Sequence, residues 1–157
     1  MRTVHYLLYM QDLLSSGYAE VVPEEEIANK SWYIPHHGVY HPRHPEKICI
    51  VFDASAKFGG ICLNDVLLSG PDMTNSLLGV LLRFRSENVA VTCDIKKMFF
   101  QFYVKPEHRD YLRFVWYKNN ILGGEIVHYR MKAHIFGATS SPSVSNFCLK
   151  QIASDNS

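Results

Sequence analysis

The sequence predicts an α+β fold in which an antiparallel sheet packs against helices. Short runs rich in β-branched and aromatic residues are bounded by turn residues, which is typical of strands. Apolar residues recur at helical spacing in other stretches. The chain has 157 residues, of which 47% are hydrophobic, so it is long and apolar enough to form one domain with a buried core.

The first third of the chain is expected to contain one helix and one strong strand. Residues 4–16 have helical apolar spacing, and Gly17 is the expected C-cap. Residues 18–22 suggest a short extended piece, and the three glutamates after Pro23 suit a helix N-terminus because they complement its dipole. Residues 31–45 are expected to be an extended, proline-punctuated lead-in to a strand over residues 47–53.

The rest of the chain predicts two helices, a strand and a hairpin. Residues 54–60 form a turn, residues 63–71 are irregular, and a helix runs from a cap at Asp72 or Thr74 to Arg85. Its apolar stripe is expected to pack in the core and consists of Leu77, Leu78, Leu81, Leu82 and Phe84. A strand over residues 89–94 ends at Asp94. Residues 111–117 and 125–131 predict a hairpin, and a last helix begins at Pro142.

Composition narrows the class of protein only in part. A formal net charge of +1 neither favours nor excludes nucleic-acid binding. No apolar run reaches the length of a membrane span and no signal peptide is evident, so we expect an intracellular, cytoplasmic protein that is not secreted and has no membrane partner. The four cysteines contain no CxxC pair, which favours reduced thiols in or near the core.

Two sets of polar residues suggest metal chemistry. Asp94, at the end of an expected strand, is a candidate metal ligand at a sheet edge, although most aspartates at strand ends are solvated or cap a turn. His37, His41 and His44 have helix-like spacing, but Pro42 and Pro45 prevent a regular helix there. In extended chain, residues four apart lie about 13 Å from each other. A metal-binding protein built on these histidines is therefore the remote alternative.

Several motifs together resemble the reverse transcriptases of Pao-type (BEL) long-terminal-repeat retrotransposons. They run in order over residues 31–148, about three quarters of the chain, and their combination is specific although no single piece is. The stretches are YIPHH (33–37) with YHP (40–42), VFDASAK (51–57) with LN (63–64), GPDMTNSL (70–77), LLRFR (81–85), DI (94–95) with MF (98–99), RD (109–110) with LRF (112–114), and HIFGA (134–138) with SSP (140–142).

The resemblance implies a partial right-hand polymerase. Residues 1–30 would be a helical lead-in, and residues 31–157 would be the fingers and an incomplete palm, with the strand to Asp94 in the middle of the palm sheet. The family joins a primer 3′-hydroxyl to a deoxynucleotide on an RNA or DNA template, using two Mg²⁺ ions, which Mn²⁺ can replace. Its other implied partners are the protease, ribonuclease H and integrase parts of a Pol polyprotein, within virus-like particles.

The resemblance also implies site residues, one motif at a time. Asp94 would be the first metal-binding aspartate, and the backbone carbonyl of Ile95 a second ligand. The amides of Lys97 and Met98 would face the triphosphate, and Phe99 would be the steric gate that rejects a 2′-hydroxyl, the alternative being a core phenylalanine. The remaining implied residues are the triphosphate-facing Arg43 and Lys47, and Phe136, Gly137, Ser141 and Pro142 near the nascent base pair and template.

Departures from the family pattern limit the expected activity. Cys49 stands where family members carry an arginine against the triphosphate, and Phe136 stands where retroviral relatives carry a glutamine. The two adjacent aspartates of the third motif do not follow Pro142. We therefore expect a polymerase fragment that is inactive as an isolated chain and poorly soluble. The alternative is a non-catalytic retroelement relic that at most binds nucleic acid.

Overall fold

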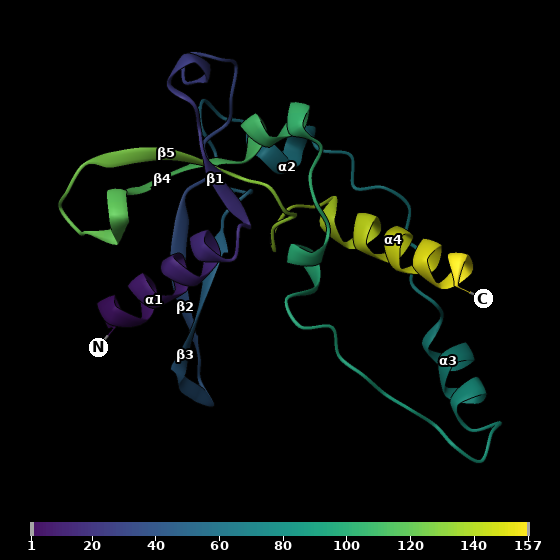
Figure 1. The fold of residues 1–157 in the computed structure, drawn as a ribbon. Coiled ribbons are helices and arrows are strands. Elements are labelled where there is room, and N and C mark those ends of the chain that lie inside the picture. Colours follow the sequence, from purple (N-terminus) through teal and green to yellow (C-terminus); the bar gives the residue numbers. More distant parts are fainter. Residues whose placement is uncertain (1, 157) are drawn as a thin grey trace.

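A computed structural model describes residues 2–156 and confirms the α+β class (Figure 1). Helix α1 spans Arg2–Ser15 and is followed by a short strand, β1 (Ala19–Val21). The remaining elements are β2 (His36–His41), β3 (His44–Phe52), α2 (Leu63–Val66), α3 (Leu77–Phe84), β4 (Arg113–Tyr117), β5 (Ile126–Met131) and α4 (Ser141–Asp155). None of the helices in residues 2–156 is long and apolar enough to cross a membrane.

A three-stranded antiparallel sheet has the order β1-β5-β4. The β4–β5 hairpin was predicted from its two apolar runs and the glycine-containing loop between them, and the structure confirms it. The short extended piece after α1 becomes the edge strand β1, in which Val21 pairs with Tyr129. Helix α1 contacts β1, and the chain turns between them at Gly17. The φ of Gly17 is 72°, the left-handed conformation expected of a C-cap glycine.

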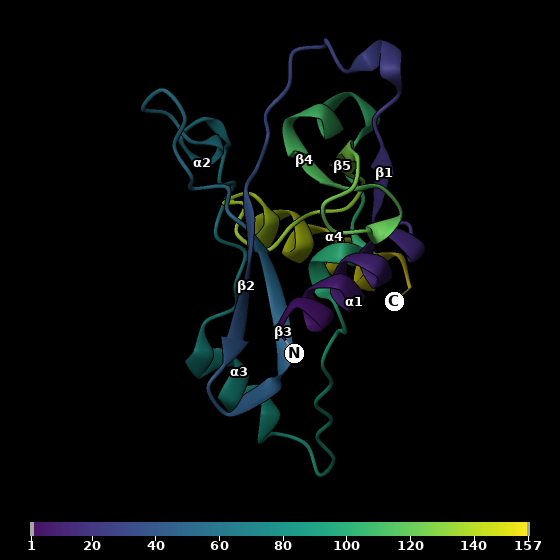
Figure 2. The same ribbon diagram turned by 90° about the vertical axis from the view of Figure 1, so that its left-hand side faces the viewer.

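Strands β2 and β3 form a separate two-stranded hairpin that extends away from the three-stranded sheet (Figure 2). Side chains alternate between its two faces because the strand period is two. Ile48, Ile50 and Phe52 lie on the inner face, where Ile50 and Phe52 are buried. Cys49 lies on the outer face and is exposed, and Lys47, next to the irregularity in the β2–β3 register, is exposed as well. The extended lead-in predicted for residues 31–45 is thus partly a strand of its own, β2.

The main core lies between α1, the inner face of the hairpin and the three-stranded sheet. Met10 and Leu13 of α1 are buried beside Phe114 of β4, Met131 of β5 and Ile135. Aromatic contacts continue this core: Phe114 meets Phe52 at 5.1 Å and stacks on Tyr129 at 5.6 Å between ring centroids. The helix predicted over residues 4–16 is confirmed, but the residues that it buries are Met10 and Leu13, whereas Val4 and Leu8 of the predicted stripe are exposed.

A partly buried cluster of six charged side chains, here called the ion cluster, ties β1, β4 and β5 to the turns beside them. Arg113 has a fully buried side chain, forms an ion pair with Asp110 at 3.0 Å and donates to the carbonyls of Glu26 and Ile27. Arg130 pairs with the same Asp110 carboxylate oxygen at 3.0 Å. The members of the ion cluster are Glu20, Glu26, Arg109, Asp110, Arg113 and Arg130.

Predictions about local structure were wrong at four places. The first is the stretch 63–71, which was expected to be irregular but begins with helix α2, Leu63–Val66. The glutamates after Pro23 form only a single 3₁₀ turn, Glu24–Glu26. The third helix begins at Leu77, with the Ser76 side chain accepting from the Gly79 amide, and its apolar residues are exposed rather than in the core. Figure 1 shows α3 standing away from the sheets, so the described chain offers no core surface for its stripe to cover.

The strand predicted to end at Asp94 is also absent. Residues 89–95 are irregular, and Val89 and Val91 are 79% and 82% exposed. A β-branched run becomes a strand only when another strand satisfies its backbone groups. Within residues 2–156 no strand pairs with this run, so the sheet expected around Asp94 is not formed.

Candidate functional site

A cavity of about 350 Å³ brings together segments that are far apart in the sequence. It is lined by Tyr9, Cys49, Lys97, Met98, Phe99, Phe100 and Phe136. Helix α1 contributes the tyrosine and β3 contributes the cysteine from its outer face. Four residues that the resemblance implies as site residues (Lys97, Met98, Phe99 and Phe136) therefore meet on one surface, together with the position at which an arginine was expected.

The backbone at Lys97 turns the chain so that residues 97–100 line this cavity. Lys97 has a φ of 53°, a left-handed conformation that costs a non-glycine residue about 1–2 kcal/mol. A 3₁₀ turn, Met98–Gln101, follows, and the Phe100 amide donates to the Lys97 carbonyl at 2.8 Å. Such backbone strain persists where the surrounding structure fixes it and is frequent at functional sites. Here it places Lys97 and Phe99 on the same cavity.

The Lys97 ammonium is held by helix α1 and by an aromatic ring. Its Nζ lies 2.5 Å from Asp12 Oδ2 and 5.1 Å from the centroid of the Tyr18 ring. The Asp12 carboxylate is half exposed, so this pair is accessible to water and ions. An anion that enters the cavity would compete with Asp12 for the lysine, since both offer oxygen acceptors to the same cation.

Two aromatic rings from different motifs form one wall of the cavity. The centroids of Phe99 and Phe136 are 5.9 Å apart with their planes tilted by 47°, which lies within the range of favourable aromatic pairs. Phe99 is partly buried, whereas Phe136 is 64% exposed. Together they offer an apolar surface beside the Lys97 cation.

The two finger-strand cations lie outside the cavity lining. Lys47 is exposed at the irregularity where the β2–β3 register shifts, two residues before Cys49. Arg43 is exposed in the turn that joins β2 to β3. Neither of the two cations implied to face the triphosphate therefore lines the cavity.

Residues after Phe136 are fixed by the fold rather than open to a ligand. Gly137 has a φ of 108°, and a Cβ at this position would lie 3.0 Å from the Phe52 carbonyl oxygen. The Asn64 side chain donates to the Gly137 carbonyl and accepts from the Thr139 amide, each at 2.9 Å. Ser141 is buried and donates to the Ile135 carbonyl at 2.8 Å. Among the residues implied near the template, only Phe136 and Pro142 are exposed side chains.

The implied metal site does not form in the described part of the chain. Asp94 is exposed in the irregular segment, followed by Ile95. Between residues 2 and 156 no group of three or more histidine, cysteine, aspartate or glutamate side chains is arranged to hold a metal ion. One carboxylate does not fit a two-ion centre. His37 and His44 of the remote alternative belong to no such group either, and the side chain of His41 lies outside the described residues.

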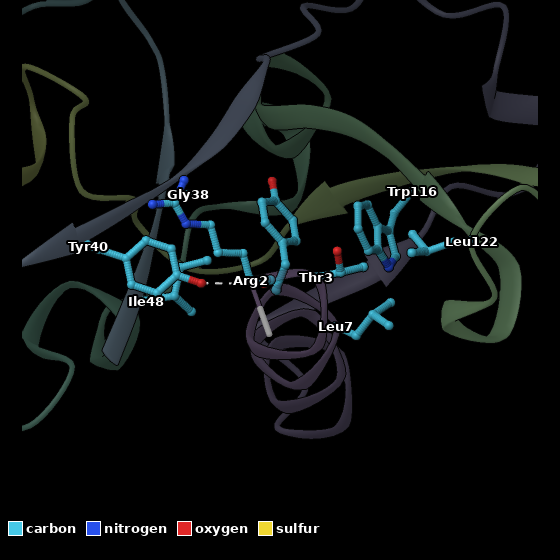
Figure 3. A pocket seen from close by; sticks show the side chains of 9 residues that line it. Arg2, Thr3, Leu7, Gly38, Tyr40, Ile48, Trp116 and Leu122 are labelled. Carbon is cyan, nitrogen blue, oxygen red and sulfur yellow. Dashed lines mark hydrogen bonds between the residues drawn. The ribbon is translucent and has the colours of Figure 1, made fainter. Parts of the chain in front are cut away.

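A second cavity, of about 370 Å³, was not predicted from the sequence. Figure 3 shows its lining of Arg2, Thr3, Tyr6, Leu7, Gly38, Tyr40, Ile48, Trp116 and Leu122. The Tyr40 hydroxyl donates to the Arg2 carbonyl at 3.3 Å, and Tyr6 stacks on Trp116 at 5.3 Å. A Cβ on Gly38 would lie 2.6 Å from Ile48 Cδ1, so a larger residue here would require the Ile48 side chain to move. The cavity forms where α1 packs on the β2–β3 hairpin, and no pattern within either stretch of sequence predicts this packing.

Comparison with known proteins assigns no family to this chain: no protein-family model matches it, and no curated protein matches it. A function must therefore be argued from the motifs and from the residues that line the cavities.

Proposed function

We propose that this chain is the fingers and first part of the palm of a retrotransposon reverse transcriptase, an RNA-directed DNA polymerase. We propose further that its cavity at Lys97, Phe99 and Phe136 accepts a deoxynucleoside triphosphate. The observation that carries the proposal is the meeting of β3, the turn after Asp94 and the segment before Gly137 on one cavity. The resemblance assigns the first two segments to nucleotide binding and the third to the nascent base pair and template.

The chemistry of the lining suits a nucleotide. A volume of about 350 Å³ lies at the lower end of the roughly 300–1,000 Å³ typical of ligand cavities. The Phe99 ring supplies a rigid surface for a sugar, and the Lys97 ammonium supplies a point charge for phosphate oxygens. Displacement of Asp12 by phosphate would keep the lysine paired, and the released Asp12 carboxylate, which is 54% exposed, would be solvated by water.

Binding is expected without nucleotide incorporation. Template-directed addition in the complete enzyme requires the primer end, the template and two metal ions held in line with the α-phosphate. The described residues contribute Asp94 alone to such a centre, and errors of positioning cost orders of magnitude in rate. A non-catalytic relic that only contacts nucleic acid is the second candidate, favoured by the isolated position of Asp94.

Calorimetric titration with dGTP and GTP in the presence of Mg²⁺ tests the nucleotide cavity. We expect dGTP to bind the wild-type chain more tightly than GTP, and Phe99→Ala to reduce this preference. Loss of a charged hydrogen-bond donor in Lys97→Ala should weaken dGTP binding about tenfold or more. Phe147→Ala and Lys57→Ala change exposed residues that do not line the cavity and serve as matched controls.

Thiol labelling locates the bound nucleotide, because the chain has two exposed cysteines, Cys49 in the cavity and Cys93 outside it. We expect dGTP to slow alkylation of Cys49 and to leave Cys93 unchanged. Primer extension on the same protein should give no product. Equal dGTP affinity in all four variants, with no protection of Cys49, would leave the relic as the better description.

A further inference from the structure

A third cavity, of about 470 Å³, lies between α2, the 3₁₀ turn before β4 and the segment that leads into α4. It is lined by Leu63, Val66, Leu67, Leu68, Val104, His108, Tyr111, Leu112, His134, Ile135, Ala138 and Ser140. Its floor belongs to the core, since Leu63 and Ile135 are 2% and 0% exposed. It shares no lining residue with the nucleotide cavity.

The cavity lining excludes strongly charged ligands. None of its residues is a lysine, arginine, aspartate or glutamate, and most are aliphatic. Phosphate groups need cations or a cluster of amide donors, so a nucleotide is a poor ligand for this cavity. Leu68 at the rim is 88% exposed, and a bound apolar molecule would shield it from water.

His134 is one of the lining residues, and its contact with Ser141 indicates which ring nitrogen carries the proton. The Ser141 hydroxyl has a single proton, which it donates to the Ile135 carbonyl at 2.8 Å. The 3.4 Å contact between Ser141 Oγ and His134 Nδ1 therefore has the ring as donor. In the neutral ring the proton is then on Nδ1, and Nε2 is an acceptor. Burial lowers the pKa of His134, which favours this neutral form at pH 7.

We propose that this cavity binds a small, uncharged aromatic molecule that carries one hydrogen-bond donor, with a phenol as the simplest case. The ring would occupy the aliphatic floor, and its hydroxyl would donate to His134 Nε2. This inference goes beyond the proposed function, because it uses neither nucleotide nor metal and none of the residues assigned to nucleotide binding. The two proposals can therefore fail separately.

Nuclear magnetic resonance with phenol and toluene tests both parts of the proposal. Methyl signals of Leu63 and Leu112 report occupancy of the floor, and the ring-nitrogen signals of His134 report the hydrogen bond. We expect both ligands to shift the leucine methyl groups, and phenol alone to shift Nε2 of His134. Toluene is the control, since a methyl group replaces the hydroxyl in a ring of the same shape.

Two variants fill the cavity from different sides. Ala138→Leu adds bulk to the floor of the cavity. Ser140→Leu adds bulk at a partly exposed position, and the Ser140 side chain makes no capping hydrogen bond to α4 that the substitution would remove. Each should abolish the phenol-dependent shifts, while Ala153→Leu on the exposed face of α4 should leave them unchanged. If Ala138→Leu does not fold, Ser140→Leu decides. Absence of phenol binding, or identical shifts of His134 with toluene, would overturn the proposal.

Discussion

The Phe99 and Phe136 rings contact each other along one wall of the cavity at Lys97, with their centroids 5.9 Å apart. This contact joins two motifs that are 37 positions apart in the sequence. It also gives a direct test of the geometry, because two side chains in contact are energetically coupled whereas distant side chains are not.

A double-mutant cycle measures this coupling. Replacing each phenylalanine by leucine, singly and together, should give a coupling energy of about 0.5 kcal/mol, at the lower end of aromatic pairs because Phe136 is largely exposed. Urea unfolding of the four proteins provides the free energies. The same cycle between Phe99 and Phe147 should be additive, since Phe147 lies on α4 against another cavity. Additivity in both cycles would contradict the contact.

Cys49→Arg should increase the affinity for deoxynucleotide. The substitution places a guanidinium on the outer face of β3, where it can reach the cavity that Lys97 already lines. An added charged donor should tighten dGTP binding about tenfold, because guanidinium groups pair with phosphate oxygens through two hydrogen bonds. Calorimetry would measure the change. Cys93→Arg, which adds the same charge in the irregular segment, is the control, and equal gains in the two variants would indicate a general charge effect.

Arg113→Met should be among the most destabilising substitutions in the chain. The Arg113 side chain is fully buried and binds Asp110 and two carbonyls, so its removal leaves buried acceptors unpaired. Breaking a buried ion pair typically costs about 3–5 kcal/mol, measurable by urea unfolding. Lys118→Met breaks an exposed pair with Glu125 at 2.7 Å and should cost less than about 1 kcal/mol. Similar costs for the two variants would argue against a buried ion cluster.

Stability should decline on the acid side in two steps. Burial lowers the pKa of His36 from its ordinary 6.5, against an opposing hydrogen bond to the Val115 carbonyl. As the pH falls, His36 is therefore protonated in the unfolded chain before it is protonated in the folded protein. Its contribution to the free energy of unfolding is constant above about pH 6.5 and declines below that pH.

The second step comes from Asp110. Burial raises the pKa of this carboxyl, but hydrogen bonds from Arg130 and Arg113 outweigh burial, so its net pKa lies below the ordinary 3.8. Its contribution is present above about pH 3.8 and is lost as the pH falls further.

Unfolding free energies measured from pH 8 to pH 3 separate the two steps. His36→Gln should remove part of the decline below pH 6.5 and leave the second decline in place. The same replacement at the exposed His108 is the control. A stability curve that is flat between pH 6.5 and pH 4.5 in the wild-type protein would contradict the role given to His36.

Sequence reasoning succeeded where the signal is local. The β4–β5 hairpin and the two terminal helices follow from apolar spacing and turn residues within one segment. It failed at Val89 and Val91, because a β-branched run forms a strand only beside a partner, and no pattern within the run shows whether that partner exists. The cavity at Lys97 and Phe99 could be anticipated only through the resemblance. Tyr9 lines this cavity only because of the way α1 packs against the rest of the protein, and tertiary packing cannot be read from one segment of the sequence.

Exposure of the α3 stripe should dominate the solubility of the chain. Leu78 and Leu82 are 68% and 63% exposed and lie one turn apart on the helix. Clustered apolar side chains on a surface favour association, so Leu78→Gln with Leu82→Gln should raise the concentration at which the protein aggregates. Because these side chains bury little area, the unfolding free energy should change by less than about 0.5 kcal/mol.

A buried leucine gives the matched comparison for this last prediction. Leu112 is 7% exposed in the main core, and Leu112→Gln should cost several kcal/mol because it removes apolar burial and brings a polar amide into the core. Light scattering and urea unfolding on the same preparations separate the two effects. If the double α3 variant lost as much stability as Leu112→Gln, the stripe would be packed in the core, as the sequence alone predicts.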